Sequence, residues 1–323
     1  MAENNMVMSG KGSRSGKRLF REETIGKLQR YKLHYLLLLI PVIHQIIFSY
    51  LPIYGVTIAF KDFKMSRGIL GSSWVGFEHF RELFSDIFFY RVLSNTLRLN
   101  ILNVIIVFPL TIVFALLINE MANLKFKRVV QTISYLPHFL SWVVISGFIY
   151  QMLSPQSGFI NVLLTKLSII PEPVNYMVSK QWFTLIYLIS SIWQGIGWGT
   201  IIYLSAIAGI DLLQYESAQL DGANRFQKAI YITLPGIVPT ITVLLILKIG
   251  SMMNVGFEQI FNLYNPSTYE VADVIDTFVF RKGIIDSRYD YSTAVGLFQN
   301  VIGFILLMMS NYFAKRFNDY SIM

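Results

Sequence analysis

The chain alternates long apolar runs with shorter polar connections. Six runs are long enough to cross a bilayer as helices, because about 20 apolar residues cover the hydrocarbon core. They cover residues 33–60, 92–118, 129–153, 182–210, 235–256 and 292–314. The first run is too long and starts too late for a cleaved signal peptide, so we expect it to remain as a span. The pattern predicts an all-α integral membrane protein with six transmembrane helices.

Composition supports this class and excludes others. Of the 323 residues, 54% are hydrophobic and only 14% are charged, which lies far outside the range of soluble globular domains. The chain has no cysteine, which excludes disulfides, thiolate metal sites and thiol chemistry. A net charge of +8 could indicate nucleic-acid binding, but many basic residues cluster directly before the first apolar run. That placement is typical of a topology signal.

The distribution of lysine and arginine predicts an orientation. With the N-terminus inside, the cytoplasmic side carries the basic tail at 1–32, the cluster at 125–128, the pair Arg225 and Lys228, and the pair Lys315 and Arg316. These outnumber the basic residues on the opposite side, so the positive-inside rule favours N-in and C-in. We expect the tail at 1–32 to be partly disordered and residues 33–323 to form the transmembrane domain.

No pattern for chemistry within this chain is found. The stretch "GKGSRSGKR" resembles a phosphate-binding loop, but Lys11 replaces its first glycine and Arg18 stands where a Ser or Thr would bind magnesium. No metal-ligand spacing is found among the histidines, which are His34, His44, His79 and His138. No catalytic motif is present either. We therefore predict a protein that is not an enzyme and holds no metal or cofactor of its own.

A polar insert, "YESAQLDGANRFQKAIYITLPG", separates two of the most apolar runs. It predicts a short helix, a sharp turn at Gly222, and a second helical piece that leads to Pro235 at the start of the next span. The predicted orientation puts this segment in the cytoplasm. A connecting loop could be shorter and less structured, so the insert favours docking into a groove of a cytoplasmic partner.

The insert also resembles the EAA loop of bacterial ABC importer permeases. That pattern reads Glu-Ala-Ala, two residues, Asp-Gly-Ala, eight residues, then Ile-x-Leu-Pro. The residues on the pattern are Glu216, Ser217 (where alanine is usual), Ala218, Asp221, Gly222, Ala223, Ile232, Leu234 and Pro235. The resemblance implies that the loop at 211–235 transmits force from an ATPase, with Glu216 and Asp221 as interface and loop-shaping residues.

Further segments within 90–315, such as "NVGFEQIFNLYNP" and "ADVIDTFVFRKGI", resemble the carbohydrate branch of these permeases, in particular the type that serves alginate, pectin and other complex oligosaccharides. The family implies a location in the bacterial cytoplasmic membrane and alternating access. It also implies a second related permease, two copies of a cytoplasmic ATPase that hold ATP and magnesium, and an extracellular or periplasmic solute-binding protein.

Two cations lie inside predicted spans, Arg98 and Lys248. Charges within a membrane are costly and usually face a cavity or a partner. One interpretation is that both line the path and attract an acidic oligosaccharide. The other is that Arg98 extends to the outer interface while Lys248 pairs with an acid of the partner permease. Further path candidates at the end of the fifth run combine polar groups with rings that suit sugars: Asn254, Phe257, Glu258, Phe261 and Tyr264.

Two other functions stay open from the sequence alone. A permease for neutral sugars would share every motif above. An ion-coupled secondary carrier could use Lys248 as a relay residue, although no acidic residue lies deep in a predicted span and a carrier does not need the docking insert.

Overall fold

The computed structural model describes residues 30–318 and divides into two units, Met1–Thr57 and Ile58–Met323. The glycine-rich stretch at 10–18 and nearly all of the basic tail at 1–32 lie outside the described residues. Each unit is considered by itself.

The described part of the first unit is helical. Helix α2 (Lys32–Gln45) continues through a π-helical turn, η1 (Ile46–Tyr50), into η2 (Leu51–Phe60), and the whole segment Lys32–Phe60 is apolar and long enough to cross a membrane. None of the α2 or η1 side chains is buried within the chain. Such a surface needs lipid or another protein around it.

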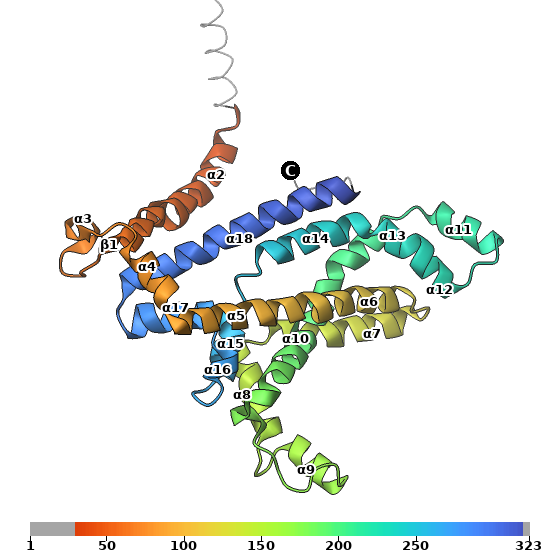
Figure 1. Ribbon diagram of the computed structural model, residues 1–323. Helices are drawn as coiled ribbons and strands as arrows, with labels where there is room; N and C mark the ends of the chain where they lie inside the picture. The colour runs from red at the N-terminus through yellow and green to blue at the C-terminus, as the bar shows by residue number, and fades with distance from the viewer. Residues whose placement is uncertain (1–29, 319–323) are drawn as a thin grey trace, which may run out of the picture. The chain divides into compact units, whose positions relative to one another are not determined.

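The second unit is almost entirely helical (Figure 1). A two-stranded hairpin opens it, with Lys61 of β1 (Lys61–Asp62) opposite Trp74 of β2 (Ser73–Trp74). The helices that follow are α3 (Gly68–Gly71), α4 (Glu78–Ser85), α5 (Ile87–Leu102), η3 (Asn103–Val107), α6 (Phe108–Asn119), α7 (Leu124–Tyr135), η4 (Leu136–Phe139), α8 (Trp142–Leu153), α9 (Phe159–Lys166), η5 (Tyr176–Val178), α10 (Lys180–Ala208), α11 (Leu212–Leu220), α12 (Arg225–Lys228), η6 (Ala229–Thr233), α13 (Leu234–Gly236), α14 (Val238–Gly250), α15 (Phe257–Leu263), α16 (Tyr269–Ala272), α17 (Ile275–Phe280), η7 (Arg281–Ile285) and α18 (Tyr289–Asn318).

The described residues contain 4 helices that could cross a membrane, or up to 6 if two bent helix pairs each count as one span. The four are Lys32–Phe60, Ile87–Asn119, Lys180–Ala208 and Tyr289–Arg316. They coincide with the first, second, fourth and sixth predicted spans to within a few residues. Apolar runs of this length therefore identified the membrane-spanning class correctly.

The third and fifth predicted spans are not simple helices. The third bends by 102° between Leu124–Phe139 and Trp142–Leu153, where Pro137 lacks an amide donor and Leu140 adopts an extended conformation. The fifth bends by 59° between Arg225–Gly236 and Val238–Gly250. Its helix ends at Gly250, so the predicted end at 256 is wrong. Residues 251–256 leave the helix, and Gly256 has φ +96°, which a side chain would disfavour.

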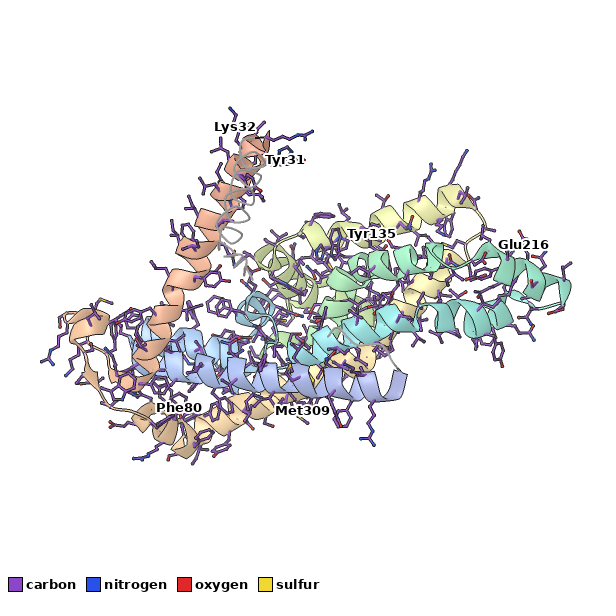
Figure 2. All side chains as sticks on the ribbon, turned by 90° about the horizontal axis from the view of Figure 1, so that it is seen from above. Tyr31, Lys32, Phe80, Tyr135, Glu216 and Met309 are labelled. Atoms are coloured by element: carbon purple, nitrogen blue, oxygen red, sulfur yellow. The ribbon has the colours of Figure 1, made fainter. Side chains whose placement is uncertain are left out.

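Small residues set how closely the helices approach. A Cβ on Gly197 of α10 would lie 2.1 Å from the Ser134 carbonyl oxygen of α7, and a Cβ on Gly250 of α14 would lie 2.5 Å from a Leu307 methyl group of α18. Gly197 and Gly250 are thus points of close contact between helices. Figures 1 and 2 show that α4, which carries Phe80, and the α11–α12 segment, which carries Glu216, lie at opposite ends of this unit.

Candidate functional site

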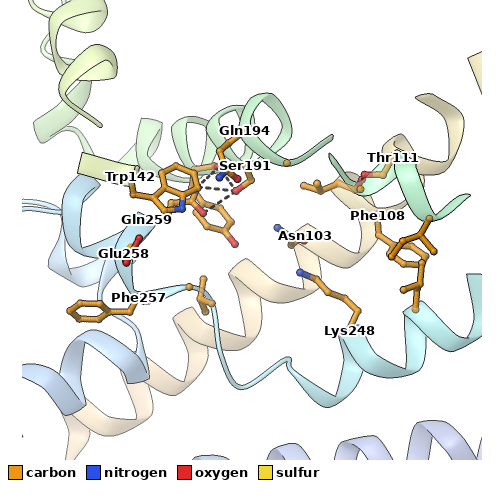
Figure 3. A pocket seen from close by; sticks show the side chains of 18 of the residues that line it. Asn103, Phe108, Thr111, Trp142, Ser191, Gln194, Lys248, Phe257, Glu258 and Gln259 are labelled. Carbon is orange, nitrogen blue, oxygen red and sulfur yellow. Dashed lines mark hydrogen bonds between the residues drawn. The ribbon is translucent and has the colours of Figure 1, made fainter. Parts of the chain in front are cut away.

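A cavity of about 640 Å³ lies where α10 passes the break between α14 and α15 (Figure 3). The π-helical turn η3, helix α6 and the first residue of α8 complete its walls. Polar and aromatic side chains share the lining, among them Asn103, Phe108, Trp142, Ser191, Gln194, Lys248, Phe257, Glu258 and Gln259. We call it the translocation cavity, because a path for a solute is the role that we propose for it.

Hydrogen bonds from Gln259 hold α15 against α10 at the cavity wall. Gln259 is 6% exposed, and its Nε2 donates to the Tyr187 carbonyl at 3.0 Å, to Ser190 Oγ at 3.0 Å and to Ser191 Oγ at 2.8 Å. Ser191 Oγ in turn donates to the Tyr187 carbonyl at 2.8 Å. Buried polar groups paired in this way fix the register of two helices.

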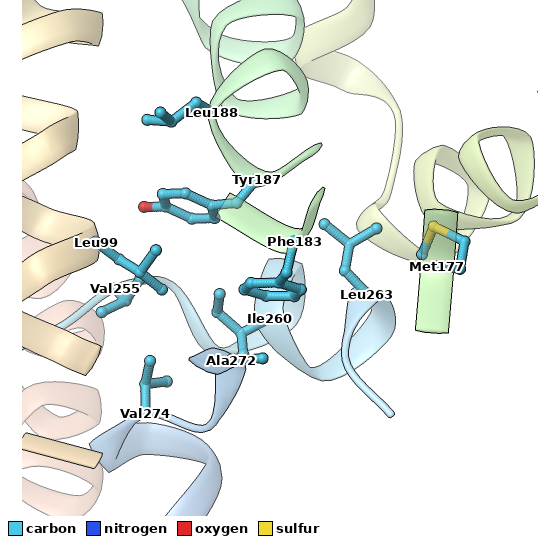
Figure 4. Packing of buried hydrophobic residues seen from close by; sticks show 10 residues of the cluster. All are labelled: Leu99, Met177, Phe183, Tyr187, Leu188, Val255, Ile260, Leu263, Ala272 and Val274. Carbon is cyan, nitrogen blue, oxygen red and sulfur yellow. The ribbon is translucent and has the colours of Figure 1, made fainter. Parts of the chain in front are cut away.

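An apolar cluster supports this wall from behind (Figure 4). Leu99 of α5, Phe183 and Tyr187 of α10, and Ile260 of α15 are buried together with Val274 before α17. Each Å² of apolar surface buried here contributes about 25 cal/mol of stabilisation. This burial holds together four segments from different parts of the chain. The cavity residues of α10 and α15 therefore sit on a packed framework.

Lys248 points its ammonium group into the cavity, toward Asn103 and with Glu258 on the far wall (Figure 3). Within residues 30–318, no ion pair or hydrogen bond of this ammonium is found. A half-buried cation without an acidic partner attracts an anion into the cavity or a carboxylate of another subunit. Both interpretations of Lys248 offered by the sequence agree with this position.

Arg98 has a different surrounding. Its Nη2 donates to the Val271 carbonyl at 2.8 Å, its side chain is exposed, and it does not line the translocation cavity. The position fits the alternative in which the arginine extends toward the interface. The two cations therefore have different surroundings, because Lys248 lines the translocation cavity and Arg98 does not.

The other predicted path residues separate into three groups. Phe257 and Glu258 line the translocation cavity. Asn254 lines a smaller cavity of about 250 Å³ beside Gln299 of α18 instead. Phe261 and Tyr264 lie outside the cavity but form a row of rings with Phe257 at its wall. The centroid of the Phe261 ring is 4.9 Å from that of Phe257 and 5.9 Å from that of Tyr264.

Sequence reasoning missed several polar lining residues. Asn103, Ser191 and Gln194 all line the cavity, together with Trp142. The signal was available, because Asn103, Ser191 and Gln194 interrupt otherwise apolar spans. Nothing in a single span, however, says that these polar groups face one another.

The segment at 211–235 forms two short helices joined by a turn. Asp211 caps α11 by accepting from the Leu213 amide at 3.0 Å, and Gly222 takes φ +80° in the turn. The Asn224 and Gln227 side chains bond each other's backbone amides at 2.9 and 2.8 Å and so start α12 with a capping box. The Tyr215 hydroxyl lies 2.9 Å from buried Thr233 Oγ1 and ties α11 to η6.

This segment leaves large apolar side chains uncovered. Leu220 is 90% exposed, Phe226 74% and Tyr231 75%. Of the predicted coupling residues, some are exposed and some are half-buried: Glu216, Ser217, Asp221, Gly222 and Pro235 are exposed, and Ala218, Ala223, Ile232 and Leu234 are half-buried. A shaped polar segment with exposed apolar anchors is typical of a protein-docking surface.

Comparisons with known proteins agree with this geometry. Residues 107–319 match the family described as binding-protein-dependent transport system inner membrane component. The chain is 44% identical to Protein LplB of Bacillus subtilis (strain 168) over 292 residues, which cover 90% of this chain and 91% of that protein. It is 42% identical over 302 residues to the polygalacturonan/rhamnogalacturonan transport system permease protein YteP of the same organism, with 94% of each chain covered.

Solved structures show the same similarity. A bacterial ABC transporter involved in the import of the acidic polysaccharide alginate contains a chain of 40% identity with a TM-score of 0.84, and the match covers 93% of this chain and 99% of that one. A second structure, of a bacterial alginate ABC transporter in complex with alginate pentasaccharide-bound periplasmic protein, gives the same identity and TM-score. The helices able to cross a membrane, the family match and these relatives lead to one conclusion: the chain belongs to the family of binding-protein-dependent transport system inner membrane components, as the membrane-spanning permease of an ABC importer.

Proposed function

We propose that this permease forms, with a second related permease, the path for an acidic oligosaccharide of the alginate or pectin type. The observation that carries the proposal is the Lys248 ammonium, which has no ion pair or hydrogen bond within residues 30–318 and faces the cavity. Amides, hydroxyls, aromatic rings, aliphatic side chains and the Glu258 carboxylate also line this cavity. Two of the similar proteins, a polygalacturonan/rhamnogalacturonan permease and a transporter involved in alginate import, support the choice of an acidic sugar.

The lining suits each part of such a ligand. Sugar hydroxyls need donors and acceptors, which Asn103, Gln194 and Glu258 supply. The apolar C–H faces of a sugar ring stack on flat aromatic side chains such as Trp142 and Phe257. A uronate carboxylate would accept a charge-assisted hydrogen bond from Lys248, and such bonds are stronger than neutral ones.

The proposed drive is ATP hydrolysis in a partner ATPase that docks on the segment at 211–235. ATP and magnesium would be held by that partner and not by this chain. Leu220 and Phe226 supply apolar anchors for the contact, while Glu216 and Asp221 shape it. Closure of two ATPase copies on nucleotide would move this segment and bias the bundle between inward-facing and outward-facing states.

The proposed orientation is N-in and C-in, with 33–323 as the permease domain. The segment at 211–235, which we call the coupling segment, then lies in the cytoplasm. The α6–α7 turn, which precedes Lys125, Lys127 and Arg128, lies toward the same end of the second unit as α11–α12 (Figures 1 and 2). Basic residues gathered at one end of a bundle favour that end as the cytoplasmic one. The hairpin and α4 would then face outward.

ATP hydrolysis by the complete complex, with its binding protein, tests the proposal. Lys248→Met keeps the length of the side chain and removes its charge, and Arg98→Met is a matched control because Arg98 does not line the cavity. Loss of one charge-assisted bond predicts that stimulation by an acidic oligosaccharide falls about tenfold or more in Lys248→Met. Stimulation in Arg98→Met should stay close to wild type.

Co-purification of the partner subunits shows that each variant assembles. If a neutral oligosaccharide stimulates ATP hydrolysis by the wild type to the same extent as an acidic one, the acidic substrate is contradicted and the neutral-sugar alternative is favoured. Equal behaviour of the two variants would remove Lys248 from the path.

A further inference from the structure

A second cavity lies near the start of α5, away from the translocation cavity. Its volume is about 290 Å³, at the lower end of the range of about 300–1,000 Å³ for small-molecule pockets. Three cations and three aromatic rings form most of its lining: Arg91, Arg281, Lys282, Phe88, Tyr269 and Phe278. We call it the cationic cavity.

The charges of this cavity are not balanced by its acids. Arg281 forms an ion pair with Asp273, the one acid in the lining, and Lys282 reaches Asp286 at 3.1 Å with both groups partly exposed. Arg91 lies over the Phe88 ring, 5.5 Å from its centroid, and has no ion pair within residues 30–318. The cavity therefore keeps an excess positive charge at an exposed edge.

A row of aromatic rings connects this cavity with the translocation cavity. Phe257, at the wall of the translocation cavity, is followed by Phe261 at 4.9 Å, Tyr264 at 5.9 Å and Tyr269 at 4.8 Å. The Arg281 guanidinium then lies over the Tyr269 ring at 5.1 Å from the centroid. We call these four rings the aromatic row.

The aromatic row is partly open to a ligand. Phe261 is exposed, and Phe257, Tyr264 and Tyr269 are half-buried. Phe280 packs against Phe257 at 5.1 Å and Phe261 at 5.3 Å, which holds those rings in place. Fixed rings that still present a face can stack on successive sugar units at little entropic cost.

We propose that the cationic cavity is an outer subsite that binds one uronate unit of an acidic oligosaccharide, and that the aromatic row guides the chain of sugars toward the translocation cavity. The carboxylate would bind at Arg91 and Lys282, and the sugar ring would stack on Tyr269. This inference rests on the proposed function, which supplies both the class of ligand and the orientation that places the first turn of α5 on the outer side of the membrane.

The absence of cysteine from the chain allows a direct test. Phe88 lines the cationic cavity and is 62% exposed, so a thiol in Phe88→Cys can be reached by a maleimide. Leu70→Cys, at a side chain 84% exposed in α3 between the two strands, is the matched control. The rate of labelling would be measured on the complete complex in nanodiscs with free alginate pentasaccharide, a neutral glucose pentasaccharide, or unloaded binding protein.

Alginate pentasaccharide at about ten times its Kd should slow labelling of Phe88→Cys roughly tenfold, while the neutral sugar leaves the rate unchanged. Adding Arg91→Gln should raise the protecting concentration about tenfold or more, the loss expected for one charge-assisted bond. Leu70→Cys should be labelled equally in every condition.

Three results would overturn the proposal. They are equal labelling with and without the acidic sugar, protection by unloaded binding protein, which would make the cavity a protein contact, and a labelling rate set by the anionic lipid content of the nanodisc. If the wild-type complex hydrolyses ATP in response to the acidic sugar while any of these holds, only the outer subsite fails. If no acidic sugar stimulates the wild type, the proposed function itself fails.

Discussion

Replacing Tyr215 with phenylalanine tests how the coupling segment is held to the bundle. The Tyr215 hydroxyl bonds Thr233 Oγ1 at 2.9 Å, and Thr233 is fully buried. The variant leaves Thr233 a weaker bond to the Lys228 carbonyl at 3.4 Å, so its hydroxyl keeps one partner. A neutral hydrogen bond contributes about 0.5–1.5 kcal/mol net, and we therefore expect a loss of about 1 kcal/mol, or roughly fivefold in the local opening equilibrium.

Hydrogen exchange of the α11 amides measures this opening. We expect exchange about fivefold faster in Tyr215→Phe, and fewer sugar molecules transported per ATP because the segment transmits movement less rigidly. Tyr312→Phe is the control, since Tyr312 is exposed on α18, far from α11 in the sequence. Unchanged α11 exchange in Tyr215→Phe would refute the view that this bond ties the coupling segment to the bundle.

Two further substitutions test the packing and the charge pairs of the second unit. Gly197→Ala puts a Cβ 2.1 Å from the Ser134 carbonyl oxygen, so α7 and α10 must separate, and we expect a lower melting temperature from a loss of about 1–3 kcal/mol; the control Gly147→Ala, which meets nothing within 4 Å, should keep or raise it. Arg288 donates to Glu82 at 2.5 and 2.7 Å, and this bond holds the pKa of Glu82 below its usual 4.5. The ion pair therefore stabilises the fold above about pH 4.5, and this stabilisation is lost as the pH falls through the lowered pKa of Glu82. Because the pair is partly exposed, Glu82→Gln should cost no more than about 1 kcal/mol at pH 7. The melting temperatures of Glu82→Gln and of the wild type should become equal in acid.

The membrane-spanning class and the two short helices and turn at 211–235 could be predicted from sequence because each depends on local pattern. Apolar runs of sufficient length form helices wherever they pack, and Gly222 marks the turn by backbone conformation alone. The prediction that Pro235 begins the next span is wrong, because the helix Arg225–Gly236 runs through it and α14 begins at Val238. The same logic failed at the end of the fifth span. Residues 251–256 are apolar enough to continue a helix, but bonds from Asn100 to the Met252 carbonyl, at 2.7 Å, and other tertiary contacts hold them in an extended turn.

The cavity could be predicted only in part. Lys248 and Arg98 look alike in the sequence, each a lone cation in an apolar run, yet only Lys248 lines the translocation cavity. Which face of a helix meets which neighbour depends on the bends at Leu140 and Ile237 and on close contacts between helices. For the same reason Gln194 and Asn103, on different spans, could not be placed together before the fold was known.

The most direct test of the account is ATP-driven accumulation of a labelled acidic oligosaccharide in proteoliposomes that contain this permease, its partner permease, the ATPase and the binding protein. We predict accumulation above the outside concentration that requires ATP and binding protein, prefers the acidic sugar over a neutral one of equal length, and loses that preference in Lys248→Met. Accumulation without ATP, or an equal preference for the neutral sugar in the wild type, would contradict the account.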